Sequence, residues 1–109
     1  MPFLRFRGFA KPDIVELAPR IVQEIARTAK VQADKVKLEL IQMEAITNHP
    51  PYIEISLFHR DQEVYDAIAL WLSHELMRYG YENAHIYFVE LNPEIYYKQG
   101  HPLMSRSHT

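Results

Sequence analysis

The second residue of the chain is the one whose type and position could do chemistry. Pro2 directly follows Met1, so removal of the initiator methionine would leave a proline with a free secondary amine at the N-terminus. Desolvation, or a nearby cation, disfavours the protonated amine and lowers its pKa. An amine with a pKa near the working pH is an effective general base. Pro2 is therefore the candidate catalytic residue, for moving a proton between a carbon and an enol oxygen.

The remaining composition excludes several other chemistries. The chain has no cysteine, which excludes disulfides, thiol nucleophiles and cysteine zinc sites. Its six histidines form no two-ligand pair at helix or strand spacing, so we expect no metal. Glycine-rich phosphate loops and nucleophile elbows are missing from the sequence, and no cofactor is predicted.

Charge and hydropathy restrict the partners and the location. The net charge of -2 indicates no nucleic-acid or anionic-membrane partner. No apolar run approaches the roughly 20 residues that span a bilayer. The N-terminus lacks the basic region and apolar core of a signal peptide, so we expect a cytoplasmic protein.

Periodicity predicts an α+β fold built from two similar halves. Alternation of apolar and polar residues predicts strands over 3–7, 36–43, 52–58 and 85–91, and helical spacing predicts helices over about 12–29 and 61–79. Shifting the first helix by about fifty residues places Ile14 on Val64 and Ile21 on Trp71. We expect a single domain over 1–109, with β-α-β units at 3–44 and 52–91 and a tail at 92–109 that frays or docks on a neighbouring subunit. The two units should form a four-stranded mixed sheet with both helices on one face.

Four charged residues are predicted on the sheet face away from the helices. Strand alternation places Arg5 and Arg7 there, together with Glu39 and Glu54. We interpret them as an ion-pair network rather than as a carboxylate-binding site. The same face should carry an apolar patch large enough to predict association, formed by Phe3, Ile41, Met43, Tyr52 and Val89.

The element order alone also fits a ferredoxin-like regulatory domain. A more specific resemblance starts at Pro2, with its short strand, Gly8, the amphipathic helix, the segment 29–35 and the strand at 36–40. This arrangement resembles the tautomerase superfamily, which includes 4-oxalocrotonate tautomerase and macrophage migration inhibitory factor. The segments 4–8 and 96–101 are similar to an uncharacterised bacterial branch of it.

The resemblance implies a homotrimer with active sites at the subunit boundaries. Pro2 matches the catalytic proline, and His85 and Tyr87 match positions from which a neighbouring subunit binds substrate. A substrate-binding lysine of the family falls beside Lys30. The implied function is keto-enol isomerisation of a small keto acid. The alternative is a non-catalytic trimer that binds a small molecule or a partner in the same cleft.

Overall fold

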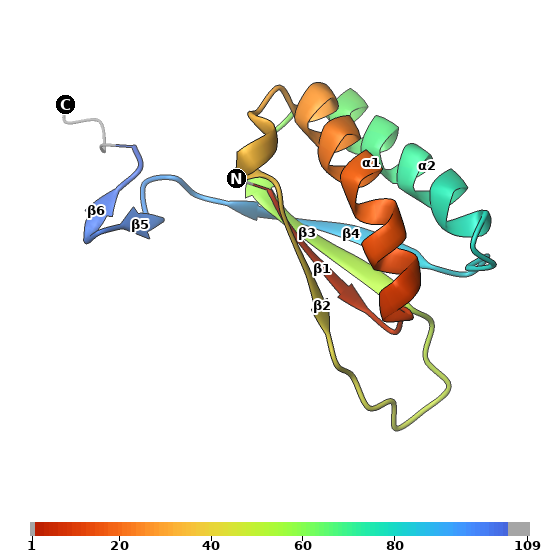
Figure 1. The fold of residues 1–109 in the computed structure, drawn as a ribbon. Coiled ribbons are helices and arrows are strands. Elements are labelled where there is room, and N and C mark those ends of the chain that lie inside the picture. The colour runs from red at the N-terminus through yellow and green to blue at the C-terminus, as the bar shows by residue number, and fades with distance from the viewer. Residues whose placement is uncertain (1, 105–109) are drawn as a thin grey trace.

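The computed structural model describes residues 2–104, which form a sheet, two covering helices and a C-terminal arm (Figure 1). Strands β1, β3 and β4 have the predicted bounds, and α1 runs unbroken through Pro19. The elements in chain order are β1 (Phe3–Arg7), α1 (Lys11–Ala29), a 3-10 turn (Ala33–Lys35), β2 (Lys37–Ile41), β3 (Tyr52–Phe58), α2 (Gln62–Met77), β4 (His85–Leu91), β5 (Tyr97–Lys98) and β6 (His101–Pro102).

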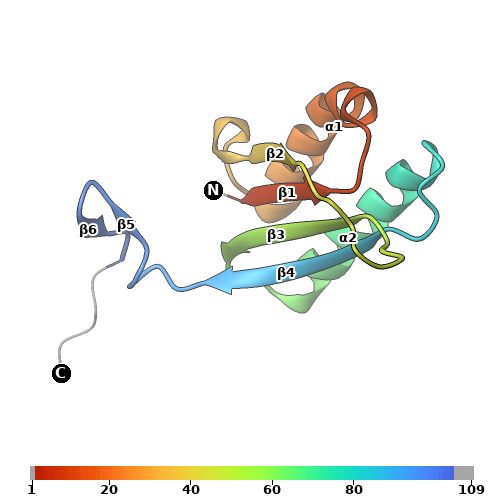
Figure 2. The same ribbon diagram turned by 90° about the horizontal axis from the view of Figure 1, so that it is seen from below.

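The main sheet has the strand order β2-β1-β3-β4 (Figure 2). Strand β1 is parallel to β2 and β3 is parallel to β4, while the central pair β1 and β3 is antiparallel. Each β-α-β unit therefore keeps its two strands adjacent, unlike the split units of a ferredoxin-like fold. The predicted α+β fold, with a four-stranded mixed sheet and two helices on one face, is confirmed.

The hydrophobic core lies between the sheet and the helices. Strand alternation sends every second side chain of β1 and β3 toward the helices, and the helical stripes meet them. These residues are almost fully buried: Leu4, Phe6, Leu17, Ile21, Ile25, Ile53, Ile55, Leu57, Ile68, Leu72 and Leu76. The opposite sheet face is left open for polar and charged side chains.

Two predicted bounds were too wide. Strand β2 covers Lys37–Ile41 rather than 36–43, because its partner β1 ends at Arg7, opposite Ile41. Helix α2 covers Gln62–Met77 rather than 61–79. Gly80 ends it at a φ of 89°, where the amide of Tyr81 donates to the carbonyl of Leu76 in a Schellman-type cap.

The sequence patterns predicted a tail over 92–109 but not the hairpin within its described part, residues 92–104, which we call the arm. Strands β5 and β6 pair across a turn at Gln99 and Gly100, both with positive φ as a tight hairpin turn requires. The arm extends away from the body of the chain (Figure 1). The radius of gyration is accordingly 15.2 Å, against about 13 Å for a compact chain of this length. The predicted behaviour of the last residues, 105–109, lies outside the described part.

Candidate functional site

Pro2 is held at the end of the central strand. Its side chain is fully buried, and its carbonyl oxygen accepts a hydrogen bond from the amide of Lys37 at 2.9 Å. Strand β1 lies between β2 and β3, so pairing on both sides keeps the N-terminal end of the strand in place. Met1 lies outside the described residues. The sequence therefore positions Pro2 through the β1–β2 pairing.

A cavity of about 660 Å³ lies at the start of β1, and we call it the lysine cavity. Phe3, the next residue, lies on its wall, and so does Lys37, which is bonded to the Pro2 carbonyl. The volume is typical of a small-molecule site. Its full lining comprises Phe3, Asp34, Lys35, Lys37, Tyr96, Tyr97, Lys98 and Leu103.

The lining combines two kinds of surface. Aromatic and apolar side chains from β1 and the arm provide area against which an organic ligand can pack. Three ammonium groups and a single carboxylate give the wall a formal excess of two positive charges. Such a cavity can hold a small organic anion next to the end of β1.

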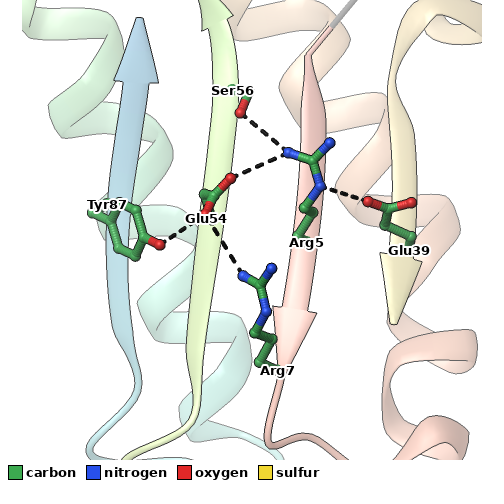
Figure 3. A network of polar contacts seen from close by, with 6 residues as sticks. All are labelled: Arg5, Arg7, Glu39, Glu54, Ser56 and Tyr87. Atoms are coloured by element: carbon green, nitrogen blue, oxygen red, sulfur yellow. Dashed lines mark hydrogen bonds and ion pairs between the residues drawn. The ribbon is translucent and has the colours of Figure 1, made fainter. Parts of the chain in front are cut away.

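The open sheet face carries a network of ion pairs (Figure 3). Arg5 Nε lies 2.7 Å from Glu39, and Arg5 Nη1 lies 3.1 Å from Glu54. Arg7 Nη1 lies 3.6 Å from Glu54, which also accepts a hydrogen bond of 2.8 Å from the Tyr87 hydroxyl. All four charged residues predicted on this face therefore contact one another. With both arginines paired to carboxylates, the network is electrically balanced.

The network shifts the titration of its members. The pKa of Glu54 lies below its usual value, chiefly because Tyr87 donates a hydrogen bond to the carboxylate and also because Arg5 and Arg7 are close, against an opposing effect of burial. The pKa of Tyr87 is raised, first by the same hydrogen bond and then by burial. Tyr87 therefore stays protonated and serves as a donor at neutral pH.

His85 lies at the opposite end of the sheet from Pro2, and Tyr87 lies level with Arg5, in the middle of β1. Register places His85 beside Tyr52, which in turn pairs with Arg7 at the far end of β1. Pro2 and Arg7 are five residues apart, which is roughly 17 Å along the strand. Within one chain, the predicted set of Pro2, His85 and Tyr87 is not brought together.

These two residues belong to a second hollow, of about 270 Å³, which we call the tyrosine cavity. Its lining comprises His49, Pro50, Tyr52, His85 and Tyr87. The rings of Tyr52 and Tyr87 stack with centroids 6.0 Å apart, and the Arg7 guanidinium lies 5.5 Å from the Tyr52 centroid. The tyrosine cavity is thus an aromatic site in contact with the charged network.

Lys30 does not reach the lysine cavity. It caps the C-terminus of α1 with a φ of 57° and lines a separate hollow of about 420 Å³ with His59 and Arg60. Arg60 also donates to the Ala29 carbonyl at 3.2 Å, which ties this corner to α1. The residue expected to bind substrate beside Pro2 is therefore at a different hollow of the same chain.

Sequence reasoning missed most of the lysine cavity. Lys35 precedes β2 and Lys98 belongs to β5, so a long stretch of chain separates residues on neighbouring walls. The parallel pairing of β1 with β2 could have pointed to Lys37, which lies opposite Phe3. Tyr97 and Leu103 carry no such signal because the fold of the arm was not predicted.

Two findings concern the described part of the chain as a whole. Between residues 2 and 104, no three histidine, aspartate or glutamate side chains gather closely enough to hold a metal ion. Within the same range, neither helix has the length and apolar character needed to cross a bilayer.

Comparison with solved structures identifies the class of fold. A fused 4-OT, solved as an asymmetric trimer, superposes with a TM-score of 0.76 at 14% identity, over 93% of this chain and 95% of that one. A macrophage migration inhibitory factor-like protein from Entamoeba histolytica gives a TM-score of 0.72 at 9% identity, over 92% and 96%. The chain therefore has the fold of the tautomerase superfamily.

The family to which the chain belongs is narrower than this superfamily. The chain belongs to the family described as Domain of unknown function (DUF1904), whose sequence model matches residues 1–102. A solved member from Sebaldella termitidis ATCC 33386 is 25% identical, with a TM-score of 0.86 over 92% of this chain and 97% of that one. A search of curated proteins found no match.

Proposed function

We propose that the chain is a tautomerase-like isomerase of a small keto acid, with the amine of Pro2 as its general base. The observation that carries this proposal is the position of Pro2, buried at the end of β1 between two residues that line the lysine cavity: Phe3, which follows it, and Lys37, whose amide binds its carbonyl. The superfamily fold and the cationic wall support it further.

The proposed reaction needs only a proton carrier. The free amine of Pro2 takes a proton from the carbon beside the keto group, and the electron pair of that bond forms the enolate. The ammonium then gives that proton to the enolate oxygen, and in the reverse direction the amine takes the proton of the enol hydroxyl and returns it to the carbon. Burial and the neighbouring lysines disfavour the ammonium form, which would lower the pKa of the amine toward neutrality.

A homotrimer would complete the site. The lysine cavity and the tyrosine cavity lie at opposite ends of the same sheet, so a single chain cannot bring the two cavities into one site. A ring of subunits can bring the His85 and Tyr87 end of one chain against the Pro2 end of the next. The projecting arm supports this assembly, since Tyr97 is 55% exposed and Met104 is 57% exposed.

Light scattering at micromolar concentration tests the assembly. We expect a mass near three times the chain mass of 12.9 kDa, because the open sheet face and the arm leave apolar surface without cover. A protein that scatters as a monomer would contradict the shared site, because His85 and Tyr87 could then not reach Pro2.

The proposed function requires a free Pro2 amine, which intact mass spectrometry of the protein can establish. We expect the mass of the chain without Met1, together with ketonisation of the enol of phenylpyruvate above the spontaneous rate. A retained Met1 would make the Pro2 nitrogen an amide without basicity, and the lysine cavity would then serve only for binding. If Met1 is removed and yet no simple keto-enol acid is turned over, the proposed isomerase activity would equally be contradicted.

A further inference from the structure

Helix α2 carries apolar side chains on its outward side as well as on its inward side. The inward stripe belongs to the hydrophobic core and consists of Ile68, Leu72 and Leu76. At about 3.6 residues per turn, positions 67, 70, 74 and 77 fall on the opposite side of the helix. Leu70 is 60% exposed and Met77 is 51% exposed, and Ala67 and His74 are exposed as well. We call these four residues the α2 stripe.

Helix α1 has a different outward face. Its exposed positions carry charged and polar side chains and two prolines, and over Lys11–Ala29 the only large hydrophobic side chain among them is Val15. Both helices cover the same face of the sheet, so the outward side of α2 points away from the sheet (Figure 1). The proposed homotrimer uses the open sheet face and the arm, and it would leave the α2 stripe without cover. An apolar stripe in that place indicates a contact with another helix.

The spacing of the α2 stripe is that of a seam between two helices. Its intervals of three, four and three residues are those of the core positions of a coiled coil. The stripe is also symmetric about Leu72, because Leu70 and His74 lie two residues to either side of it and Ala67 and Met77 lie five. When two copies of α2 run antiparallel and cross at the level of Leu72, the small Ala67 of one copy therefore faces the long Met77 of the other.

The charges beside the stripe are complementary in the same arrangement. Glu63 and Asp66 are exposed at the N-terminal end of α2, and within residues 2–104 neither carboxylate forms an ion pair. At the C-terminal end Glu75 lies 3.1 Å from Arg20 and 3.2 Å from Arg78, so a single carboxylate faces two guanidinium groups. The antiparallel arrangement places the acidic end of each helix beside the basic end of the other, with Asp66 of one copy at the level of Arg78 of the second. A parallel arrangement would bring like charges together.

We infer that α2 of one chain docks antiparallel on α2 of a second copy of the chain, through the α2 stripe. The contact is isologous, since the same surface serves both copies. A single stripe of one helix covers less area than the roughly 800 Å² per partner of a stable complex, so the contact is weak. It therefore joins assemblies formed through the sheet only at protein concentrations above the micromolar range.

Light scattering over a range of concentrations tests the contact. Between about 10 µM and about 1 mM, we expect the mass of the full-length protein to rise above its micromolar value. Leu70→Glu should raise the concentration needed by more than about tenfold, because the new carboxylate would lose its water in the contact. Val15→Glu is the matched control: Val15 is 61% exposed but lines a groove beside β2, and its replacement should shift that concentration by less than about twofold. A mass independent of concentration would overturn the second copy as the occupant and leave the stripe to a helix of another protein, and equal effects of the two variants would overturn it as well.

Disulfide cross-linking tests the antiparallel direction. The chain has no cysteine, so Ala67→Cys and Met77→Cys each introduce a single thiol. The two positions face each other in the antiparallel contact, and a mixture of the two variants should form a covalent dimer on oxidation. Either variant alone should form much less of it, because position 67 lies about 15 Å along the axis from position 67 of the second copy, and a disulfide spans at most roughly 7 Å between Cα atoms. Dimers that form as readily in each variant alone as in the mixture would contradict the antiparallel pairing. Both tests are independent of Pro2 and of turnover, so their outcome is separate from that of the isomerase proposal.

Discussion

Replacing Pro2 by alanine should lower the ketonisation rate by about 10²–10⁴-fold, the usual contribution of a positioned general base. Alanine leaves a primary amine on a chain end without the ring that fixes it in the buried position of Pro2. The rate should fall while the oligomeric state, measured by light scattering, stays that of the wild type.

Pro12→Ala is the matched control for this variant. Pro12 occupies the first turn of α1, beyond the opposite end of β1 from Pro2, and is exposed. The same exchange there should leave the rate within a factor of about two. If Pro2→Ala keeps the wild-type rate, the base is another residue.

Replacing Glu54 by alanine should lower the free energy of unfolding by about 2 kcal/mol, because three partners lose a charged acceptor. Arg5 keeps Glu39, but Arg7 and Tyr87 lose their contact with this carboxylate. The Glu54 side chain is only 21% exposed, so water replaces these contacts incompletely. Urea unfolding at a fixed protein concentration measures the change.

Glu44→Ala is the control for Glu54→Ala. Glu44 is exposed in the connection between β2 and β3, and its replacement should change the free energy of unfolding by less than about 0.5 kcal/mol. Equal losses in the two variants would contradict the role given to the network.

The same carboxylate makes stability depend on pH. The pKa of Glu54 is lowered in the folded chain, first by the Tyr87 hydrogen bond, so its contribution to stability is complete above the ordinary pKa of 4.5 and is lost as the pH falls through the lower folded pKa. Glu90 is shifted in the same direction, by hydrogen bonds from Tyr65 and His59. The difference between wild type and Glu54→Gln should therefore shrink below about pH 4.5 and isolate the contribution of Glu54. A difference that is constant with pH would argue against it.

The sequence patterns predicted more of the fold than of the candidate site. Alternation sufficed for β1, β3 and β4, because the core lies on one face of the sheet and apolar side chains therefore recur at every second position. The same alternation put Arg5 and Glu54 on a common face, since side-chain direction along a strand is a local property. The hydrogen bond from Tyr87 depends in addition on β4 lying next to β3, which strand alternation cannot specify.

The lysine cavity depends on tertiary structure throughout. Lys35 and Lys98 line one cavity because the arm leaves the body near the start of β2, and neither the direction nor the hairpin of the arm has a periodic signal. Strands of two residues are too short for alternation to reveal. Lys30 was chosen by resemblance alone, and the left-handed cap of α1 places it in another hollow.

The central position of β1 has a kinetic consequence during synthesis. Phe3 pairs with Lys37 and Ser56, which the ribosome adds 34 and 53 residues later. At about 5–20 residues per second, the first strand waits roughly 3–10 s for its second partner. During that time Pro2 is neither buried nor hydrogen-bonded, and an aminopeptidase can reach Met1. The N-terminal cleavage that the proposed chemistry requires can therefore take place before β1 pairs with β3.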